Sequence, residues 1–218
     1  MSRNAAPPPR GLLFLVTAPT AAGKDSVLRT LRGRGVDLSW VTTAVTRAPR
    51  EGEVDGRDHF FLEPAEFESR LRAGWFLESA RVYGRLYGTP LHQVQEPLAA
   101  GQDVVLRLDV QGARELQRLV PEAIVIFIEP PSVEEAMRRL QTRGTESPDE
   151  SERRLQAMLG FEMDFASRAD YRVPNATGEL EAAADQVWAI VEAERLREPP
   201  RRVDPATLRP WSDPPVEP

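Results

Sequence analysis

Three apolar runs along the chain predict buried strands. The first covers residues 12–17 and ends directly in turn-forming residues. Runs rich in β-branched residues follow at 104–109 and 123–128. Strands without alternating polar positions are typical of a sheet that is covered on both faces. These segments therefore predict the central strands of a buried sheet.

Helical patterns alternate with these strands. Gly33 and Gly35 are stop signals for the first predicted helix, and Pro130-Pro131 precedes a later one. An order in which strands alternate with helices indicates a parallel sheet with helices on both faces. The predicted helices cover residues 26–31, 113–119, 133–143, 150–165 and 179–195.

The stretch from about 43 to 96 breaks this alternation. It contains short Thr, Val, Phe and Tyr runs, several glycines and Asp-Gly turns, which predict a small inserted subdomain with antiparallel strands. Residues 1–10 and 198–218 are rich in proline and charge, so we expect two disordered tails. The folded domain should then cover residues 11–197.

Composition narrows the class of protein. The 218 residues include 41% hydrophobic residues, enough for a core, and no cysteine, which excludes disulfides and thiolate chemistry. No apolar run approaches the roughly 20 residues of a membrane span, and residues 1–10 lack a signal-peptide core. We expect a cytoplasmic protein. The net charge of −6 argues against a nucleic-acid partner, and two histidines offer no metal cluster.

The single lysine is the most informative residue for chemistry. Of 28 basic residues, only Lys24 is lysine, and it follows the first predicted strand. A compact ammonium fits inside a ring of backbone amides around a phosphate, whereas a planar guanidinium is too broad. The position predicts a phosphate-binding loop that ends at the start of a helix.

This loop departs from the usual pattern of Gly, four residues and Gly-Lys-Ser/Thr. Gly23 and Lys24 are intact, while Ala18 replaces the first glycine and Asp25 replaces the hydroxyl residue that ordinarily ligates Mg²⁺. Alanine at position 18 is acceptable if its φ is negative. Asp25 and Ser26 are the candidate Mg²⁺ ligands, although they lie about 100° apart around a helix.

A second group of residues favours binding of a phosphate monoester. Arg47 and Arg50 are three residues apart around a proline, and two such guanidinium groups suit a dianion. Glu78 is the one acid in an apolar neighbourhood that could accept two donors from a guanine edge. Thr43 and Thr89 could bind the base oxygen or the same edge. The alternative for any one of these residues is a surface hairpin with solvated charges.

Together these blocks resemble the guanylate kinase family, over about residues 12–195. Further matches are Asp109-Val-Gln111-Gly112, Arg139 to Arg143, Arg153-Arg154 and Asn175. The resemblance implies an α/β P-loop fold of three layers with a parallel sheet. It also implies an inserted mixed α/β subdomain that binds GMP and a small helical lid at about 139–157.

The resemblance further implies the reaction ATP + GMP, or dGMP, to ADP and the diphosphate, with Mg²⁺ bound as ATP-Mg. Lys24, Arg47, Arg143 and Arg154 would be catalytic. The implied ATP-binding residues are Ala18, Pro19, Thr20, Ala21, Ala22, Gly23, Lys24, Asp25, Ser26, Arg139 and Arg143. The implied GMP-binding residues are Thr43, Arg47, Arg50, His59, Glu78, Tyr87, Thr89, Asp109 and Gly112.

Several positions depart from the family pattern. Besides Asp25, these are Ala21 for a glycine, His59 for a phosphate-binding tyrosine, Arg107 for an acid, and Ala176 for an acid. We expect an imidazole N–H of His59 to donate to phosphate and to add pH sensitivity near neutrality. Relative to the family pattern, an acid is gained at position 25 beside the loop and an acid is lost at position 107 near the strand end. We therefore expect the two changes to be linked.

Two alternatives remain open. The Gly-Lys-Asp-Ser sequence also occurs in ribose 1,5-bisphosphate phosphokinase, an enzyme with little use for a guanine pocket. Glu78, Thr89 and Asp109 therefore weigh against it. A catalytically silent guanylate-kinase-like module that binds a protein partner is the other alternative. Retention of Lys24 and of the predicted lid arginines argues against that second possibility.

Overall fold

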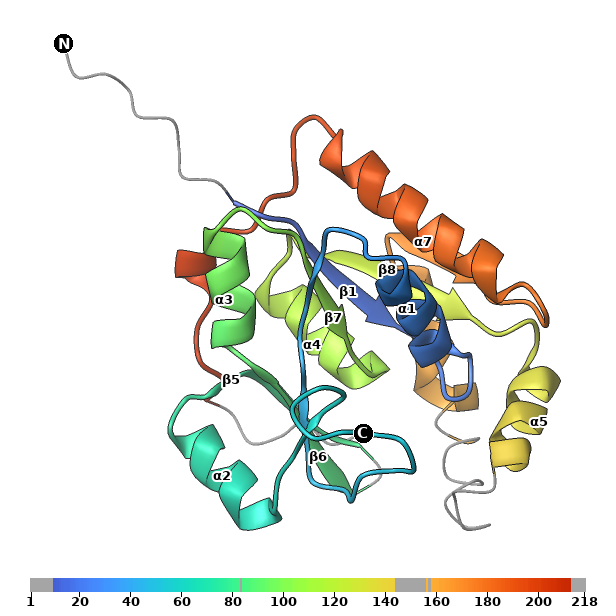
Figure 1. The fold of residues 1–218 in the computed structure, drawn as a ribbon, viewed down its shortest axis with the longest axis horizontal. Helices are drawn as coiled ribbons and strands as arrows, with labels where there is room; N and C mark the ends of the chain where they lie inside the picture. Colours follow the sequence, from blue (N-terminus) through green and yellow to red (C-terminus); the bar gives the residue numbers. More distant parts are fainter. Residues whose placement is uncertain (1–9, 83, 144–155, 157, 213–218) are drawn as a thin grey trace.

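The main sheet has five parallel strands. The computed structural model describes residues 10–82, 84–143, 156 and 158–212 (Figure 1). The strand order is β2-β7-β1-β8-β9. The strands are β1 (Leu13–Thr17), β2 (Ser39–Trp40), β7 (Val104–Arg107), β8 (Ile124–Glu129) and β9 (Tyr171–Pro174). The three predicted central strands are confirmed, whereas the two edge strands are too short and too polar to be predicted.

Helices cover both faces of this sheet. Leu13 and Leu15 of β1 belong to one core cluster, together with buried residues of α3 (His92–Ala99) and α4 (Val110–Leu119). Phe14 and Val16 point to the other face, where they pack with α1 (Lys24–Gly33) and α7 (Leu180–Arg195). This is the three-layer arrangement expected from the alternating strands and helices.

A second sheet of four strands lies below the main sheet in Figure 1. Its order is β4-β3-β6-β5, and α2 accompanies it. The elements are β3 (Ala44–Val45), β4 (Phe60–Phe61), α2 (Pro64–Arg72), β5 (Phe76–Val82) and β6 (Arg85–Pro90). The β5–β6 and β3–β6 pairs are antiparallel as expected. Strands β3 and β4 are parallel, because the loop at 46–59 carries the chain back to the end of the sheet at which β3 begins.

The region of the predicted lid is only partly described. Helix α5 (Val133–Arg143) has the predicted bounds. Most of the expected lid at 139–157 lies outside the described residues. The helix predicted at 150–165 is not continuous in its described part, which has a π-helical turn at Met158–Glu162 and a 3₁₀ turn at Asp164–Arg168. Gly160 in this stretch disfavours a regular helix. Among the described helices, none is long and apolar enough to cross a membrane.

The expectation of a disordered tail from residue 198 is wrong for the described residues up to 212. Val203, Leu208 and Trp211 are buried in this segment. The Val203 amide donates to the Gly11 carbonyl (3.2 Å), and the Trp211 amide donates to the Phe76 carbonyl (2.7 Å). Prolines and charges dominate the average composition, which hides three well-spaced apolar anchors. The segment runs beside α3 to β5 and so joins both sheets (Figure 1).

Deleting residues 199–218 should therefore destabilise the protein. At roughly 1.5–3 kcal/mol for each fully buried side chain, loss of the three gives an upper estimate of about 4.5–9 kcal/mol. Residual burial in the unfolded chain reduces this by about a third, so the free energy of unfolding should fall by about 3–6 kcal/mol. Denaturant unfolding followed by far-UV circular dichroism measures this. Deletion of residues 213–218 alone removes none of these contacts and serves as the control. Equal midpoints for both deletions would contradict the packing described here.

Candidate active site

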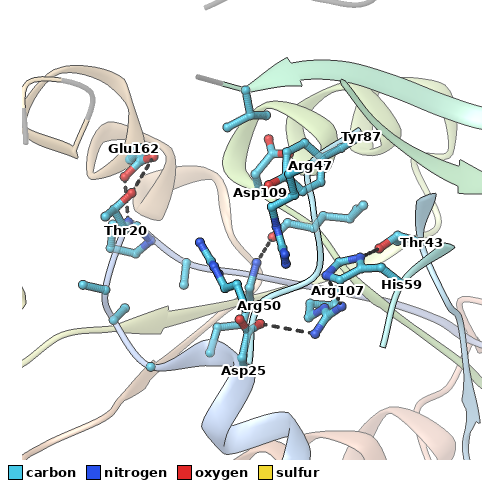
Figure 2. A pocket seen from close by; sticks show the side chains of 18 of the residues that line it. Thr20, Asp25, Thr43, Arg47, Arg50, His59, Tyr87, Arg107, Asp109 and Glu162 are labelled. Carbon is cyan, nitrogen blue, oxygen red and sulfur yellow. Dashed lines mark hydrogen bonds and ion pairs between the residues drawn. The ribbon is translucent and has the colours of Figure 1, made fainter. Parts of the chain in front are cut away.

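A cleft lies between the carboxyl ends of the parallel strands and the second sheet. Ligands of open α/β sheets bind at this end of the strands. The loop after β1, the end of β7 and strands β5 and β6 all contribute side chains (Figure 2). The predicted residues that line it are Ala18, Pro19, Thr20, Ala21, Ala22, Gly23, Lys24, Asp25, Thr43, Arg47, Arg50, His59, Glu78, Tyr87 and Asp109.

The loop between β1 and α1 has the backbone of a phosphate-binding loop. Gly23 has a φ of 89°, and a Cβ there would lie 2.3 Å from Nδ2 of Asn175, so only glycine fits. Asn175 Nδ2 donates to the Ala22 carbonyl (2.7 Å) and fixes the loop from β9. Ala21 has a φ of 60°, which explains why glycine is common in the family there. Ala18 is outside the positive-φ region, as its alanine requires.

Lys24 begins α1 and directs its ammonium into the cleft. The Nζ atom donates to the carbonyl of Leu108, just after β7. Removal from water lowers the pKa of Lys24, and nearby Asp25 opposes this shift. The ammonium therefore lies at the inner end of the loop, where a phosphate oxygen can replace the carbonyl as its acceptor.

A carboxylate contacts the outer side of the loop. The Thr20 amide donates to Oε2 of Glu162 (2.7 Å), and Glu162 is buried. The residue comes from the π-helical turn that follows the predicted lid. The sequence predicts only an ordinary helix over residues 150–165, so it does not identify Glu162 as part of the site. The sequence feature that could have identified it is an acid directly after the apolar stretch Met-Leu-Gly-Phe.

The two arginines of the second motif are held by an acid that the sequence analysis overlooked. The Glu53 carboxylate accepts hydrogen bonds from both terminal nitrogens of Arg47, at 2.5 and 2.7 Å, and from the backbone amide of Arg50 (2.8 Å). Burial alone would raise the pKa of Glu53, but these hydrogen bonds lower it to about 2. Arg47 is therefore buried, charged and fixed in one orientation. Glu53 follows Arg47 by six residues, so the pair lies within one short segment of the sequence.

Glu78 forms the far wall of the cleft. It lies on β5 directly opposite Thr89 of β6, whose hydroxyl donates to Oε1 at 2.6 Å. Burial raises the pKa of Glu78 to about 8, despite that hydrogen bond. A Cβ on Gly112 would lie 3.1 Å from Oε2, so the glycine lets α4 approach this carboxyl group. Thr89 and Gly112 thus support Glu78 from behind and do not line the cleft.

Asp109 has a structural role in addition to its predicted one. Its Oδ1 accepts the amides of Gln111 (2.7 Å) and Gly112 (3.0 Å), so it is the N-cap of α4. The same carboxylate lines the cleft near Lys24. One residue therefore caps α4, two positions after the end of β7, and contributes negative charge to the cleft.

His59 does not have the surroundings that the sequence analysis expected. Its Nδ1 lies 2.9 Å from the Thr43 hydroxyl and its Nε2 lies 2.9 Å from Nη2 of Arg107. Burial, together with the positive charges of Arg107 and Arg47, lowers the pKa of His59 to about 3. Both ring nitrogens are engaged within the protein, so the expected pH sensitivity near neutrality does not follow.

The expected link between Asp25 and Arg107 is a direct ion pair. Nη1 of Arg107 lies 3.7 Å from Oδ1 of Asp25 (Figure 2). Ser26, the other candidate Mg²⁺ ligand, does not line this cleft. It lines a neighbouring cavity with Gly23, Arg139 and Asn175. The two candidate metal ligands therefore line adjoining cavities, which share Ala21 and Gly23.

Arg139 is brought to the phosphate loop, to which it lies close at Ala22. Nη1 of Arg139 lies 3.4 Å from the Ala22 carbonyl, and Nε donates to Glu135 (2.9 Å). The side chain of Arg143 and the whole of Arg154 lie outside the described residues. In the described part of the chain, no three His, Asp or Glu residues are grouped to hold a metal ion.

Comparisons with known proteins agree with this geometry. The guanylate kinase family profile matches residues 11–194. A guanylate kinase of Nitrosomonas europaea is 45% identical over 85% of this chain and 90% of its own length. One of Rubrobacter xylanophilus is 41% identical over 84% and 94%. The crystal structure of guanylate kinase from Anaplasma phagocytophilum has a TM-score of 0.72 and 28% identity, covering 91% of this chain and 93% of that one. Since the family match spans both sheets and the cleft between them, this chain belongs to the guanylate kinase family.

Proposed function

We propose that this protein transfers the γ-phosphoryl group of ATP to GMP, and also to dGMP, to give ADP and the nucleoside diphosphate. The observation that carries this proposal is the buried carboxyl group of Glu78, which faces the cleft opposite the phosphate loop. In its ionised form this group accepts the ring N–H and exocyclic amine of guanine, and these donors favour the ionised form over the protonated one that burial favours in the empty site. Arg47 and Arg50 line the same cleft and suit the monophosphate.

The main obstacle to this reaction is the repulsion between two polyanions. The acceptor is already an anionic phosphate, so it needs no strong general base. Cations that surround the passing phosphoryl group supply most of the rate enhancement. Arg47 is suited to this because Glu53 fixes its guanidinium before any substrate binds. Each essential cation contributes about 4–7 kcal/mol, by analogy with arginine fingers worth about 10³–10⁵ in rate.

Mg²⁺ fits this cleft as part of ATP-Mg. Such ions are usually held by one or two carboxylates together with substrate phosphates, not by a complete protein cage. Asp25 lines the cleft beside the phosphate loop and supplies one carboxylate. Bound Mg²⁺ neutralises charge on the phosphate oxygens. Arg107 competes with the ion for Asp25, so we expect Asp25 to hold the ion less tightly than an unpaired carboxylate would.

Arg139, Arg143 and Arg154 complete the proposed ATP side. Arg139 lies against the phosphate loop at Ala22. We propose that Arg143 and Arg154 reach the transferred phosphoryl group from the lid at about 139–157. Closure of such a lid excludes the water that would otherwise hydrolyse ATP.

The alternative acceptor, ribose 1,5-bisphosphate, fits this cleft less well. It has no base to pair with the carboxyl group of Glu78, which would then remain buried opposite the sugar. The silent binding module is also disfavoured, because Lys24 and the loop geometry at Gly23 are retained.

A coupled assay of ADP release tests the proposed function directly. ATP-Mg²⁺ is offered with GMP, dGMP, AMP, UMP or ribose 1,5-bisphosphate. We expect turnover with the two guanine nucleotides and at least about 100-fold lower kcat/KM with the others, because mismatched bases leave buried polar groups unpaired. Preferred turnover of ribose 1,5-bisphosphate would establish the alternative acceptor. No turnover with any acceptor, despite a folded sample, would favour the binding module.

Replacing Lys24 with arginine should abolish turnover while the protein stays folded. A guanidinium is too broad for the position beside the Leu108 carbonyl, so kcat should fall by about 10³ or more. Steady-state kinetics and thermal unfolding measure the two effects. Arg29→Lys, on the exposed side of the same helix, is the matched control and should keep wild-type activity. A near-normal rate in Lys24→Arg would show that the lysine is incidental.

Stability should depend on pH through Glu78. Its folded pKa is about 8, above the ordinary value of 4.5, so the protonated form adds stability that is lost as pH rises from about 4.5 to about 8. Compared with Glu78→Gln, the wild-type free energy of unfolding should fall across this window, by at most about 1.4 kcal/mol per pH unit. Denaturant titrations at several pH values provide the test. Parallel curves for the two proteins would mean that Glu78 does not titrate there.

A further inference from the structure

Three residues that depart from the family pattern form one connected chain. Asp25 lies in the first turn of α1 directly after the phosphate loop, Arg107 lies at the end of β7, and His59 is the residue before β4. Arg107 pairs with Asp25 through Nη1 and contacts His59 through Nη2, and His59 contacts Thr43 (Figure 2). The chain thus runs from the loop that faces ATP to a threonine that lines the acceptor side of the cleft.

The contact with Arg107 fixes the position of the proton on His59. A guanidinium has only donors, so Nε2 of the ring must be the acceptor at 2.9 Å. The second N–H of the same Nη2 is occupied by the Asp58 carbonyl, at 2.8 Å. The neutral imidazole must then carry its proton on Nδ1. That N–H donates to the hydroxyl oxygen of Thr43 at 2.9 Å.

The tautomer of His59 in turn decides what Thr43 offers a ligand. A hydroxyl has one donor and two acceptor lone pairs. When Nδ1–H donates to Oγ1, the hydroxyl proton of Thr43 is left to point into the cleft that the residue lines. In the opposite tautomer, Thr43 would donate to Nδ1 and could only accept from a ligand. GMP presents acceptors to it, either phosphate oxygens or the oxygen of guanine.

We propose that Arg107 is a positioning residue for the acceptor nucleotide: it holds His59 as the Nδ1–H tautomer and so makes Thr43 a hydrogen-bond donor to the substrate. The tyrosine common at position 59 in the family would present its own hydroxyl to phosphate. Here the histidine is engaged within the protein, and Thr43 provides the donor. The kinetic part of this proposal rests on the proposed function, whereas the tautomer does not.

The tautomer can be measured without any substrate. The chain has two histidines, so the long-range ¹H–¹⁵N spectrum of ¹⁵N-histidine-labelled protein has two rings, and His92→Gln assigns His59. We expect the Nδ1–H tautomer in the wild type and in Arg107→Lys, which keeps a donor. Arg107→Met should shift the ring towards Nε2–H. Finding Nε2–H in the wild type, or no change in Arg107→Met, would overturn the proposal.

Arg57 provides a matched control for loss of charge. It also lies beside Asp58, but it pairs with the Asp58 carboxylate at 2.7 Å, and its hydrogen bonds go to that carboxylate and the Gly52 carbonyl. Arg57→Met should leave the tautomer of His59 unchanged. A shift of equal size in this variant would assign the effect to general electrostatics and contradict a specific role for Arg107.

A double-mutant cycle tests the consequence for binding. Arg107→Met should raise KM for GMP about tenfold, the value of one hydrogen bond to a charged group, and KM for ATP clearly less. In a Thr43→Val background, the same change should alter KM for GMP less than about twofold, while Thr43→Ser should retain the full effect. Additive losses would show that Arg107 does not act through Thr43. If no acceptor is turned over at all, the proposed function fails, and the tautomer measurement still decides the role of Arg107.

Discussion

Several positively charged side chains line one cleft, and the protein must hold them close together even when no anion is bound. This constraint explains the internal partners around the site. The ammonium of Lys24 donates to the Leu108 carbonyl, Arg47 is paired with Glu53, and Arg139 is paired with Glu135. Each partner lowers the cost of holding a partly buried positive charge. Each partner also fixes the direction of the cation, so the reacting groups are arranged before the substrates arrive.

The central layers of the fold could be predicted because their residues are patterned by burial alone. The continuous apolar run of β1 and the stop signals after α1 depend on local sequence, and both predictions are confirmed. The edge strand β9 has a single buried residue, Val173, so it carries too little pattern to be recognised. The packed segment after residue 198 was missed for a related reason. Its three anchors lie among prolines and arginines that dominate a compositional average.

The site shows a different limit of sequence reasoning. The residues that line the cleft could be predicted because the loop lysine, the two arginines and the acid at position 78 occur together in one order and spacing, although each alone has other uses. The contacts of Glu162 with Thr20 and of Arg107 with His59 were not predicted, because they join distant segments of the chain. Glu53 is only six residues from Arg47, but nothing in the local pattern sets it apart from the neighbouring acids. His59 is the clearest case. The sequence predicts a phosphate donor that titrates near neutrality, whereas burial and two hydrogen bonds make it a neutral link between two other residues.

The packed segment that follows α7 has a mechanical consequence. It is hydrogen-bonded to Gly11 beside the main sheet and to Phe76 in the second sheet, and Pro210 packs against Gly74. Any movement of the second sheet relative to the main sheet must also displace the short segment between Val203 and Trp211, because this segment is hydrogen-bonded on both sides. The chain thereby carries its own tether, a covalent restraint on the distance between the two sheets.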